Sequence, residues 1–313
     1  MSAPTARRRP VGQSGRGQHR AADERSGLGR AARRRRLPAG SDRPGPRCPA
    51  EHVRDAYSTR LPGHTGAVYA AVFHPGGRLL ATAGTNATTR LWDTADPHHP
   101  RVAGTIGDPA NGGFLATAFS PDGTVLAAAG AVGGIRLWNV TDPARPRPAL
   151  VLIGHSGGVR RIAFRADGRL LASAGTDDTV RLCDPRSGAA VATLTGHTGD
   201  VSAVVFTPDG HTLVSTSADT TVRLWDVTTP AAPRPSAVLT GHTDRVLAAA
   251  VSPDGRELAT GGFDNTLRLW DLTTPQHRPL AALTGHTSGI AAVAFSPDGR
   301  TAATGSYDFT VRL

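Results

Sequence analysis

The sequence has few cysteines and no long apolar run. Its two cysteines, Cys48 and Cys183, are too few for a disulfide framework or a four-cysteine zinc site, so we expect reduced thiols and a cytoplasmic setting. No stretch approaches the roughly twenty consecutive apolar residues of a membrane-spanning helix, and no apolar signal segment stands near Met1. These absences predict a soluble protein with no membrane partner.

Lysine is absent altogether, so all 35 basic residues are arginines. Residues 1–60 hold 15 arginines and 5 acidic residues, whereas residues 61–313 hold 20 of each. The whole net charge of +10 therefore lies in the first sixty residues. Arginine, alanine, glycine and proline share GC-rich codons. The absence of lysine is consistent with a GC-rich, bacterial genome, and a selected arginine surface is the alternative interpretation.

Residues 1–52 are rich in Arg, Gly, Pro and Ser and carry almost no large apolar side chains. Such a segment cannot bury enough apolar surface to offset its ordering entropy, so we predict that it is a disordered tail. Its longest basic run is Arg33, Arg34, Arg35 and Arg36. These arginines could neutralise phosphates, but no aromatic residue interleaves with them to stack on bases. Three interpretations remain for the tail: a solvated linker, an over-extended start site, or an arm that binds nucleic acid or an acidic partner.

The remainder of the chain is a repeat with a period of about 44 residues. A glycine, followed by histidine in five of the six units, opens each unit at Gly63, Gly107, Gly154, Gly196, Gly241 and Gly285. Within a unit, Val-, Thr- and Leu-rich runs of about five residues alternate with Pro-Asp-Gly and Asp turns, which predicts four short antiparallel strands. A single unit of this kind cannot cover both of its faces. The units must therefore pack face to face around an axis.

Five units run from their glycine to Trp, or to a residue in its place, and the sixth ends on Leu313, one residue before that position. Gly-His followed by Trp-Asp at this period resembles the WD-repeat β-propeller family. The resemblance covers residues 53–313, with repeats that start near residues 61, 105, 152, 194, 239 and 283. It implies an all-β propeller of six four-stranded blades. The Pro- and Arg-rich connectors, such as "TDPARPRP", resemble those of repeat arrays in actinobacterial signalling proteins.

The resemblance also implies a structural hydrogen-bond network in most blades. In each network a His would bond a Ser or Thr and an Asp or Asn, and the Trp indole N–H would donate to the hydroxyl. The matching residues are His64, Thr82, Asn86 and Trp92; His155, Ser173 and Asp177; His197, Ser215, Asp219 and Trp225; His242, Thr260, Asp264 and Trp270; and His286, Thr304 and Asp308. An enzyme needs one such set in a cleft and not five copies around a ring. We therefore expect no catalytic residue, no cofactor and no metal.

Three units depart from this pattern. The second has Asp108 for the His, Ala128 for the hydroxyl and Val132 for the Asp. It keeps only Trp138, so we expect apolar packing alone to hold that blade. The third unit carries Cys183 at the Trp position, and the sixth has no Trp.

Ring closure depends on residues 54–64, "RDAYSTRLPGH". Leu61 stands two residues before a Gly-His pair, as Leu152 and Leu239 do, so this segment could supply an outer strand to the last blade. Its residues Ser58 and Arg60 are more polar than those of the other outer strands. We expect a closed six-bladed ring. The alternative is an incomplete seven-bladed or longer array, and an unclosed ring would expose apolar faces on its first and last blades.

The sequence contains no phosphate loop, metal cluster or nucleophile elbow, so we favour a non-enzymatic, monomeric scaffold for protein partners. Aromatic and Arg residues make interface hot spots. The candidates on the face that carries the Gly-His turns are Tyr69, Arg160, Asp200, Asp244, Arg245, Phe263 and Tyr307. Phe263 and Tyr307 could instead only pack over adjacent turns. Two other functions stay open: a sensor or regulatory array severed from a bacterial signalling kinase or NTPase, and nucleic-acid association through the tail.

Overall fold

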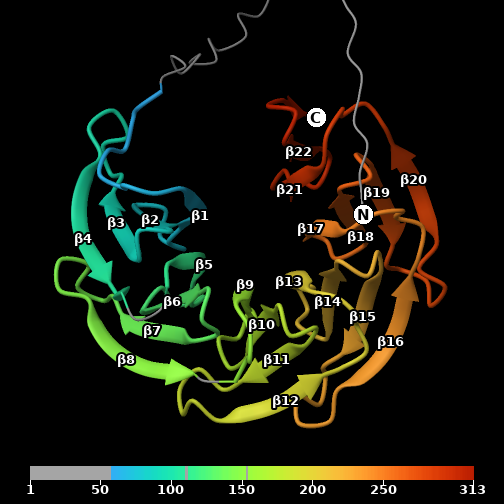
Figure 1. Cartoon of the computed structure of the whole chain (residues 1–313), viewed down its shortest axis with the longest axis horizontal. Coiled ribbons are helices and arrows are strands. Elements are labelled where there is room, and N and C mark those ends of the chain that lie inside the picture. The colour runs from blue at the N-terminus through green and yellow to red at the C-terminus, as the bar shows by residue number, and fades with distance from the viewer. Residues whose placement is uncertain (1–57, 110–111, 153) are drawn as a thin grey trace, which may run out of the picture. The chain divides into compact units, whose positions relative to one another are not determined.

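The computed structural model describes residues 58–109, 112–152 and 154–313. The predicted tail, with its arginine run and Cys48, lies outside these residues. The regular elements of the described part are 23 β-strands, which form six sheets. The fold-class prediction is confirmed, because the six sheets are the blades of an all-β propeller (Figure 1). Within the described residues, none of the segments is a helix of the length and hydropathy that crossing a bilayer requires.

Each blade is an antiparallel meander of strands that follow one another in the chain. Blade 1 consists of β1 (Val68–Phe73), β2 (Leu79–Gly84), β3 (Thr88–Asp93) and β4 (Arg101–Gly107); blade 2 of β5 (Phe114–Phe119), β6 (Val125–Gly130), β7 (Ile135–Asn139) and β8 (Arg147–Leu152); and blade 3 of β9 (Val159–Phe164), β10 (Leu171–Gly175), β11 (Val180–Cys183) and β12 (Ala190–Leu194). Blade 4 consists of β13 (Val201–Phe206), β14 (Thr212–Ser217), β15 (Val222–Asp226) and β16 (Arg234–Leu239); blade 5 of β17 (Val246–Val251), β18 (Glu257–Gly262), β19 (Leu267–Asp271) and β20 (Pro279–Leu283); and blade 6 of β21 (Ile290–Phe295), β22 (Ala302–Ser306) and β23 (Val311–Arg312).

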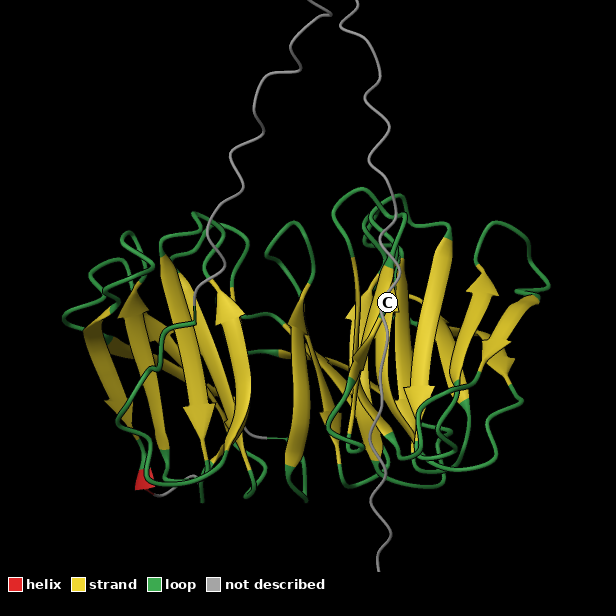
Figure 2. Ribbon diagram, turned by 90° about the horizontal axis from the view of Figure 1, so that it is seen from above, coloured by secondary structure: helices red, strands yellow, loops and turns green. Residues whose placement is uncertain are grey.

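The first strand of every blade lies nearest the centre, and the fourth strand of blades 1 to 5 lies at the rim (Figure 1). The strands run between two faces on which the connecting loops gather (Figure 2). Local chemistry sets these turns. After β5, for example, Asp122 Oδ1 accepts the N–H of Thr124 at 3.0 Å and Gly123 takes a φ of 75°, a left-handed conformation that glycine adopts without strain.

The hydrophobic core lies between neighbouring blades. Leu182 of blade 3 packs in one cluster with Phe206 and Trp225 of blade 4. Similar clusters join blades 1 and 2, blades 2 and 3, blades 4 and 5, and blades 5 and 6. Within the described residues, no such cluster joins blade 6 to blade 1. In the described part of the chain, the six blades therefore form an arc that is open between its first and last members (Figure 1).

The sixth blade differs from the expectation of four strands and a closed ring. Its sheet has three strands, and residues 58–67 form no strand that could complete it. Two physical reasons account for the difference. The partner strand β23 is two residues long and offers a short ladder. Ser58 and Arg60 are both exposed and supply no apolar side chain to bury, while Pro62 has no N–H to donate.

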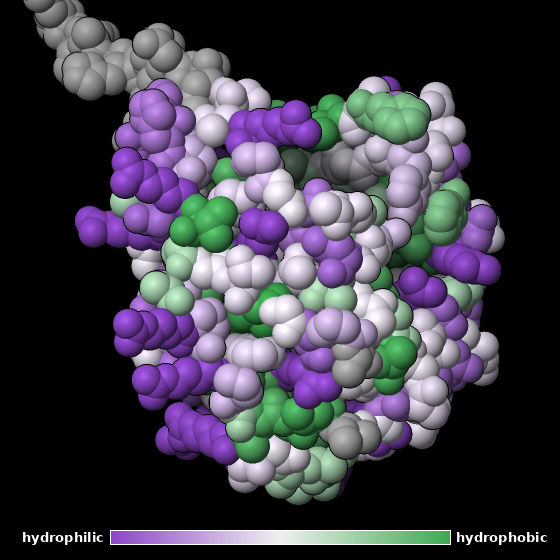
Figure 3. Space-filling model, turned by 60° about the vertical axis from the view of Figure 1, so that its left-hand side comes forward, coloured by the Kyte–Doolittle hydropathy of each residue, from purple (hydrophilic) through white to green (hydrophobic). Residues whose placement is uncertain are grey.

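The open arc exposes apolar side chains on its end blades. The phenylalanine that ends an innermost strand inserts against the preceding blade: Phe119 packs on blade 1 and Phe206 on blade 3, each 8% exposed. Phe73 holds the same place in blade 1, which is the first blade of the described residues, and is 61% exposed. On blade 6, Val311 is 73% exposed. By contrast, the side of the molecule in Figure 3 shows apolar side chains in small groups among polar ones.

This difference between equivalent residues can be tested by mutation. Phe206→Ala should lower the free energy of unfolding by about 3–5 kcal/mol, because it removes buried packing between blades 3 and 4. Phe73→Ala should cost less than about 1 kcal/mol, because its ring is mainly exposed. Urea denaturation followed by circular dichroism measures both. Equal losses would contradict the open arc, since they would mean that Phe73 packs against blade 6 in solution.

Candidate functional site

The network of blade 4 shows how the loops on one face are held. His197 Nε2 lies 2.8 Å from Ser215 Oγ, and His197 Nδ1 lies 2.8 Å from Asp219 Oδ2. Trp225 Nε1 donates to Ser215 Oγ at 2.9 Å. A carboxylate only accepts and an indole only donates, so Nδ1 of His197 carries its proton and the Ser215 hydroxyl donates to Nε2. Every polar atom of this buried set has a partner, which fixes the loop before β15.

Four other blades carry the same arrangement. In all of them the His Nε2 atom lies 2.8–2.9 Å from a hydroxyl, and the His Nδ1 atom lies 2.8–3.1 Å from a carboxylate or amide oxygen. These contacts join His64 to Thr82 and Asn86, His155 to Ser173 and Asp177, His242 to Thr260 and Asp264, and His286 to Thr304 and Asp308. Trp92 and Trp270 each donate to the Thr hydroxyl of their own blade at 2.9 Å.

Near pH 7 the aspartates of these networks are charged, and His155, His197 and His242 are neutral. Burial alone would raise the pKa of Asp177, but hydrogen bonds from His155, Thr179 and the Ser156 N–H outweigh it and lower the pKa to about 2. Burial is outweighed in the same way at Asp219, whose pKa also falls to about 2. The pKa of His155 is lowered by burial, against the opposing effect of its aspartate. Both shifts favour the state in which the aspartate is charged and its histidine is neutral.

Blade 2 replaces the network by an ion pair. Asp108 stands at the His position and contacts the guanidinium of Arg136 on β7. The sequence predicts apolar packing alone for this blade, and the structure adds the charge pair because Arg136 lies on the strand next to the Asp108 loop. Trp138 Nε1 has no hydrogen-bond partner within the described residues.

Blade 3 lacks the indole donor. Cys183 Sγ points to the carbonyl oxygen of Leu171 at 3.6 Å, so Ser173 Oγ receives no bond like that from Trp225 in blade 4. A cavity of about 40 Å³ lies beside Cys183 and is lined in part by Ser173 and Gly188. Burial raises the pKa of the Cys183 thiol to about 12, so the thiol stays protonated.

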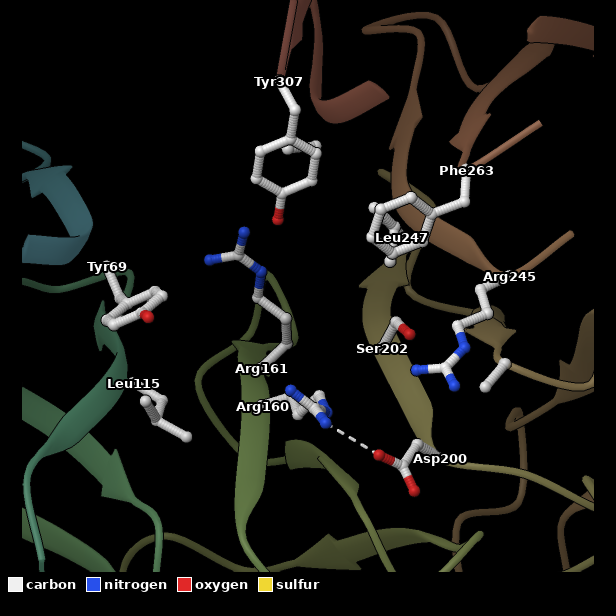
Figure 4. Close-up of a pocket in the computed structure, with 12 residues that line it drawn as sticks. Tyr69, Leu115, Arg160, Arg161, Asp200, Ser202, Arg245, Leu247, Phe263 and Tyr307 are labelled. Carbon is white, nitrogen blue, oxygen red and sulfur yellow. Dashed lines mark hydrogen bonds and ion pairs between the residues drawn. The ribbon is translucent and has the colours of Figure 1, made fainter. Parts of the chain in front are cut away.

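The residues expected to bind a partner meet at the centre of the propeller. A pocket of about 390 Å³ opens there, and six of the seven predicted residues line it: Tyr69, Arg160, Asp200, Arg245, Phe263 and Tyr307 (Figure 4). The seventh, Asp244, is not among the lining residues. Its Oδ1 atom instead accepts the N–H of Arg245 at 2.7 Å.

A repeated β-bulge supplies half of the residues that line the pocket. Near the start of each innermost strand the pairing with the second strand skips one residue, and a bulge of this kind redirects the side chain of the skipped residue. The skipped residues are Tyr69, Leu115, Arg160, Ser202, Leu247 and Ala291, and all six line the pocket. One backbone feature therefore presents six different side chains to the same space.

The aromatic wall stands on loops that the networks hold. Phe263 and Tyr307 stack with their ring centroids 5.7 Å apart and their planes at 12°. Each ring directly precedes a network aspartate, Asp264 or Asp308. Asp264 also accepts the N–H of Thr243 at 3.1 Å, which ties together the two loops of blade 5 on this face. The two rings pack over their turns and also remain open to the pocket, at 40% and 55% exposure.

The pocket carries an excess of positive charge. Arg160 NH2 and Asp200 Oδ2 form an ion pair at 2.7 Å. Arg161 and Arg245 also line the pocket, so three arginines face one carboxylate. Arg161 was not among the residues predicted from the sequence. An alignment of the six repeats could have found it, because the other five carry alanine at the position after the bulge.

A family model described as the WD domain, G-beta repeat, matches residues 56–93, 146–184, 188–226, 233–271 and 277–313, which is more than half of the chain. The chain belongs to the WD-repeat family. The stretch between the first two matches, residues 94–145, contains the first three strands of blade 2. The WD-repeat model thus passes over the blade in which Asp108 and Arg136 take the place of the network.

One curated relative shares a short stretch with this WD-repeat protein. It is the probable cytosolic iron-sulfur protein assembly protein Ciao1 of Anopheles gambiae, which is 47% identical over 36 residues. The match covers 12% of this chain and 11% of the relative. The shared stretch is therefore shorter than one repeat of about 44 residues.

Acid should destabilise the propeller in two steps. Because burial lowers the pKa of His155, His197 and His242 below 6.5, the unfolded chain binds more protons below that pH and the free energy of unfolding falls. The pKa values of Asp177 and Asp219 are lowered from 3.8 to about 2, so a second loss should follow as the pH drops from about 4 to 2.

Urea midpoints measured from about pH 8 to pH 3 test both steps. Asp177→Asn is the matched variant, because it keeps an acceptor for His155 and removes one titrating carboxylate. It should flatten the part of the curve below about pH 4 relative to the wild type. A wild-type midpoint that does not change with pH would contradict the assignment.

Restoring the tryptophan of blade 3 should stabilise the protein. Cys183→Trp would extend into the adjoining cavity and place an indole N–H near Ser173 Oγ, as in blades 1, 4 and 5. Cys183→Phe adds similar bulk without the donor. The Trp variant should exceed the Phe variant by about 1 kcal/mol in free energy of unfolding, the usual contribution of one hydrogen bond. Urea denaturation in which Phe equals or exceeds Trp would contradict this assignment.

Proposed function

We propose that this WD-repeat propeller is a non-enzymatic scaffold whose protein partner docks over the central pocket. The observation that carries the proposal is the convergence of three aromatic rings and three arginines, supplied by blades 1, 3, 5 and 6 and their loops, on one space. Clusters of Tyr, Phe and Arg that frame a pocket are where binding energy concentrates in protein interfaces. Propellers of this family are typical of interaction scaffolds, which supports the proposal by analogy of fold.

The environment of the hydroxyl groups supports the non-enzymatic part of the proposal. Ser215 has no exposed surface, and its Oγ atom is bonded to His197 and Trp225. Ser173 is 1% exposed and Thr260 has no exposed surface. A catalytic nucleophile has to reach its substrate with its oxygen atom. These hydroxyls are enclosed within their blades and serve to hold the loops.

A cytoplasmic setting accompanies the proposal. Cys183 is a free, buried thiol, as expected for a protein folded under reducing conditions.

The proposal is tested by capture and then by affinity. The full chain, tagged at one end, is used to isolate proteins from the source cells, and the protein recovered is purified and titrated by calorimetry. Phe263→Ala combined with Tyr307→Ala should weaken binding about thirtyfold or more, the effect of losing a hot spot of about 2 kcal/mol.

The matched control is Phe73→Ala combined with Phe309→Ala. Both rings are exposed, and neither lines the pocket. This control should change the affinity by less than about twofold, as expected for residues outside a hot spot. Unaltered binding by the Phe263 and Tyr307 variant, or an equal loss in the control, would overturn the assignment of the pocket.

A further inference from the structure

Arg161 lines the pocket at a position where the other five blades carry alanine. It stands on β9 directly after the bulge, paired in register with Ala174. The same register position in the other innermost strands is occupied by Ala70, Ala116, Ala203, Ala248 and Ala292. The backbone thus accepts a methyl group at this place in five blades. The fold therefore does not require the long cationic side chain that blade 3 carries at this position.

The guanidinium of Arg161 is partly removed from solvent, and no anionic group of the described residues is paired with it. It is half-buried, and no carboxylate within the described residues forms an ion pair with it. The nearest acid of the pocket, Asp200, is already paired with Arg160. Burial lowers the pKa of Arg161, while Tyr307 has the opposite effect. An arginine stays protonated under these conditions, so a charge is held partly desolvated and uncompensated.

Aromatic rings flank this charge. The guanidinium of Arg161 reaches into the pocket between Tyr69 and Tyr307 (Figure 4). Tyr307 is itself held by its stack with Phe263. A phenol can donate a hydrogen bond, and the planar guanidinium presents a fork of N–H donors that suits a carboxylate. The volume of about 390 Å³ accommodates a few extended residues.

We infer that the pocket receives an acidic peptide segment whose Asp or Glu carboxylate pairs with Arg161. This inference rests on the proposed function and specifies the partner's chemistry. A peptide is favoured over nucleic acid because a phosphate backbone is bound through many cations in a row. In this pocket only Arg161 and Arg245 lack an acidic partner within the described residues.

The experiment titrates the full chain with a capped hexaglutamate peptide by calorimetry at about 0.15 M salt, where long-range attraction to the arginine-rich first sixty residues is screened. Arg161→Ala should weaken binding about tenfold to a hundredfold, the effect of losing a charged hydrogen bond of about 1.5–3 kcal/mol. Arg169→Ala is the charge-matched control. Arg169 is exposed in the turn between β9 and β10 and does not line the pocket, so its variant should bind within about twofold of the wild type.

Alanine is the natural residue at this position of five other blades, so Arg161→Ala should fold normally, which circular dichroism checks. Arg161→Lys is the second variant. It keeps the charge and loses the fork, so its affinity should fall between those of the wild type and the alanine variant. Equal weakening by Arg161→Ala and Arg169→Ala, or no weakening by either, would overturn the inference.

A single-stranded thymidine hexanucleotide is the competing probe. If it binds more tightly than hexaglutamate and loses its affinity in Arg161→Ala, the occupant is nucleic acid and the acidic-peptide assignment is wrong. The scaffold function has a separate readout. If Phe263→Ala with Tyr307→Ala abolishes partner binding while Arg161→Ala leaves partner and hexaglutamate affinities unchanged, docking at the pocket stands and recognition of an acidic group fails.

Discussion

Packing of each blade against the next is the interaction on which the rest of the structure depends. A sheet of four strands has two faces, and both are apolar near the centre of this propeller, so a blade alone cannot bury them. Leu182, Phe206 and Trp225 show the solution, since residues of blades 3 and 4 share one cluster. The same demand explains the exposed Phe73 of blade 1, whose apolar face has no neighbouring blade to cover it within the described residues.

The hydrogen-bond networks hold the loops on one face of the propeller in fixed positions. Each network ties a Gly-His loop to the turn before the third strand, so the residue in front of the Asp is presented at a fixed place. Phe263 and Tyr307 occupy that place in neighbouring blades and stack across the boundary between them. Most of the network residues are buried within the blades. They act indirectly, by positioning the two rings that we propose contact the partner. Blade 2, which holds Asp108 against Arg136, contributes Leu115 to the pocket through its bulge alone.

Repetition of the backbone with variation of the side chains gives the pocket its chemistry. All six bulges direct a side chain to the centre, but the residues differ in size, polarity and charge. The next position is uniform except at Arg161, where an alanine is replaced by a cation. This substitution changes the electrostatics of the space that the six blades share.

The blades could be predicted from the sequence, because alternating apolar runs, Pro-Asp-Gly turns and the Gly-His and Trp-Asp pairs are local patterns that specify strands and turns. The same spacing placed His197, Ser215 and Asp219 in one blade, since residues of one repeat unit come together whatever the neighbours do. Which residues of different blades meet depends on the tertiary structure, because six bulges on separate strands converge through packing between sheets. For that reason Arg161 was missed, and Asp244, expected beside Arg245 on the same face, does not line the pocket. The three-stranded sixth blade and the open arc also depend on long-range pairing, which residues 58–62 do not supply.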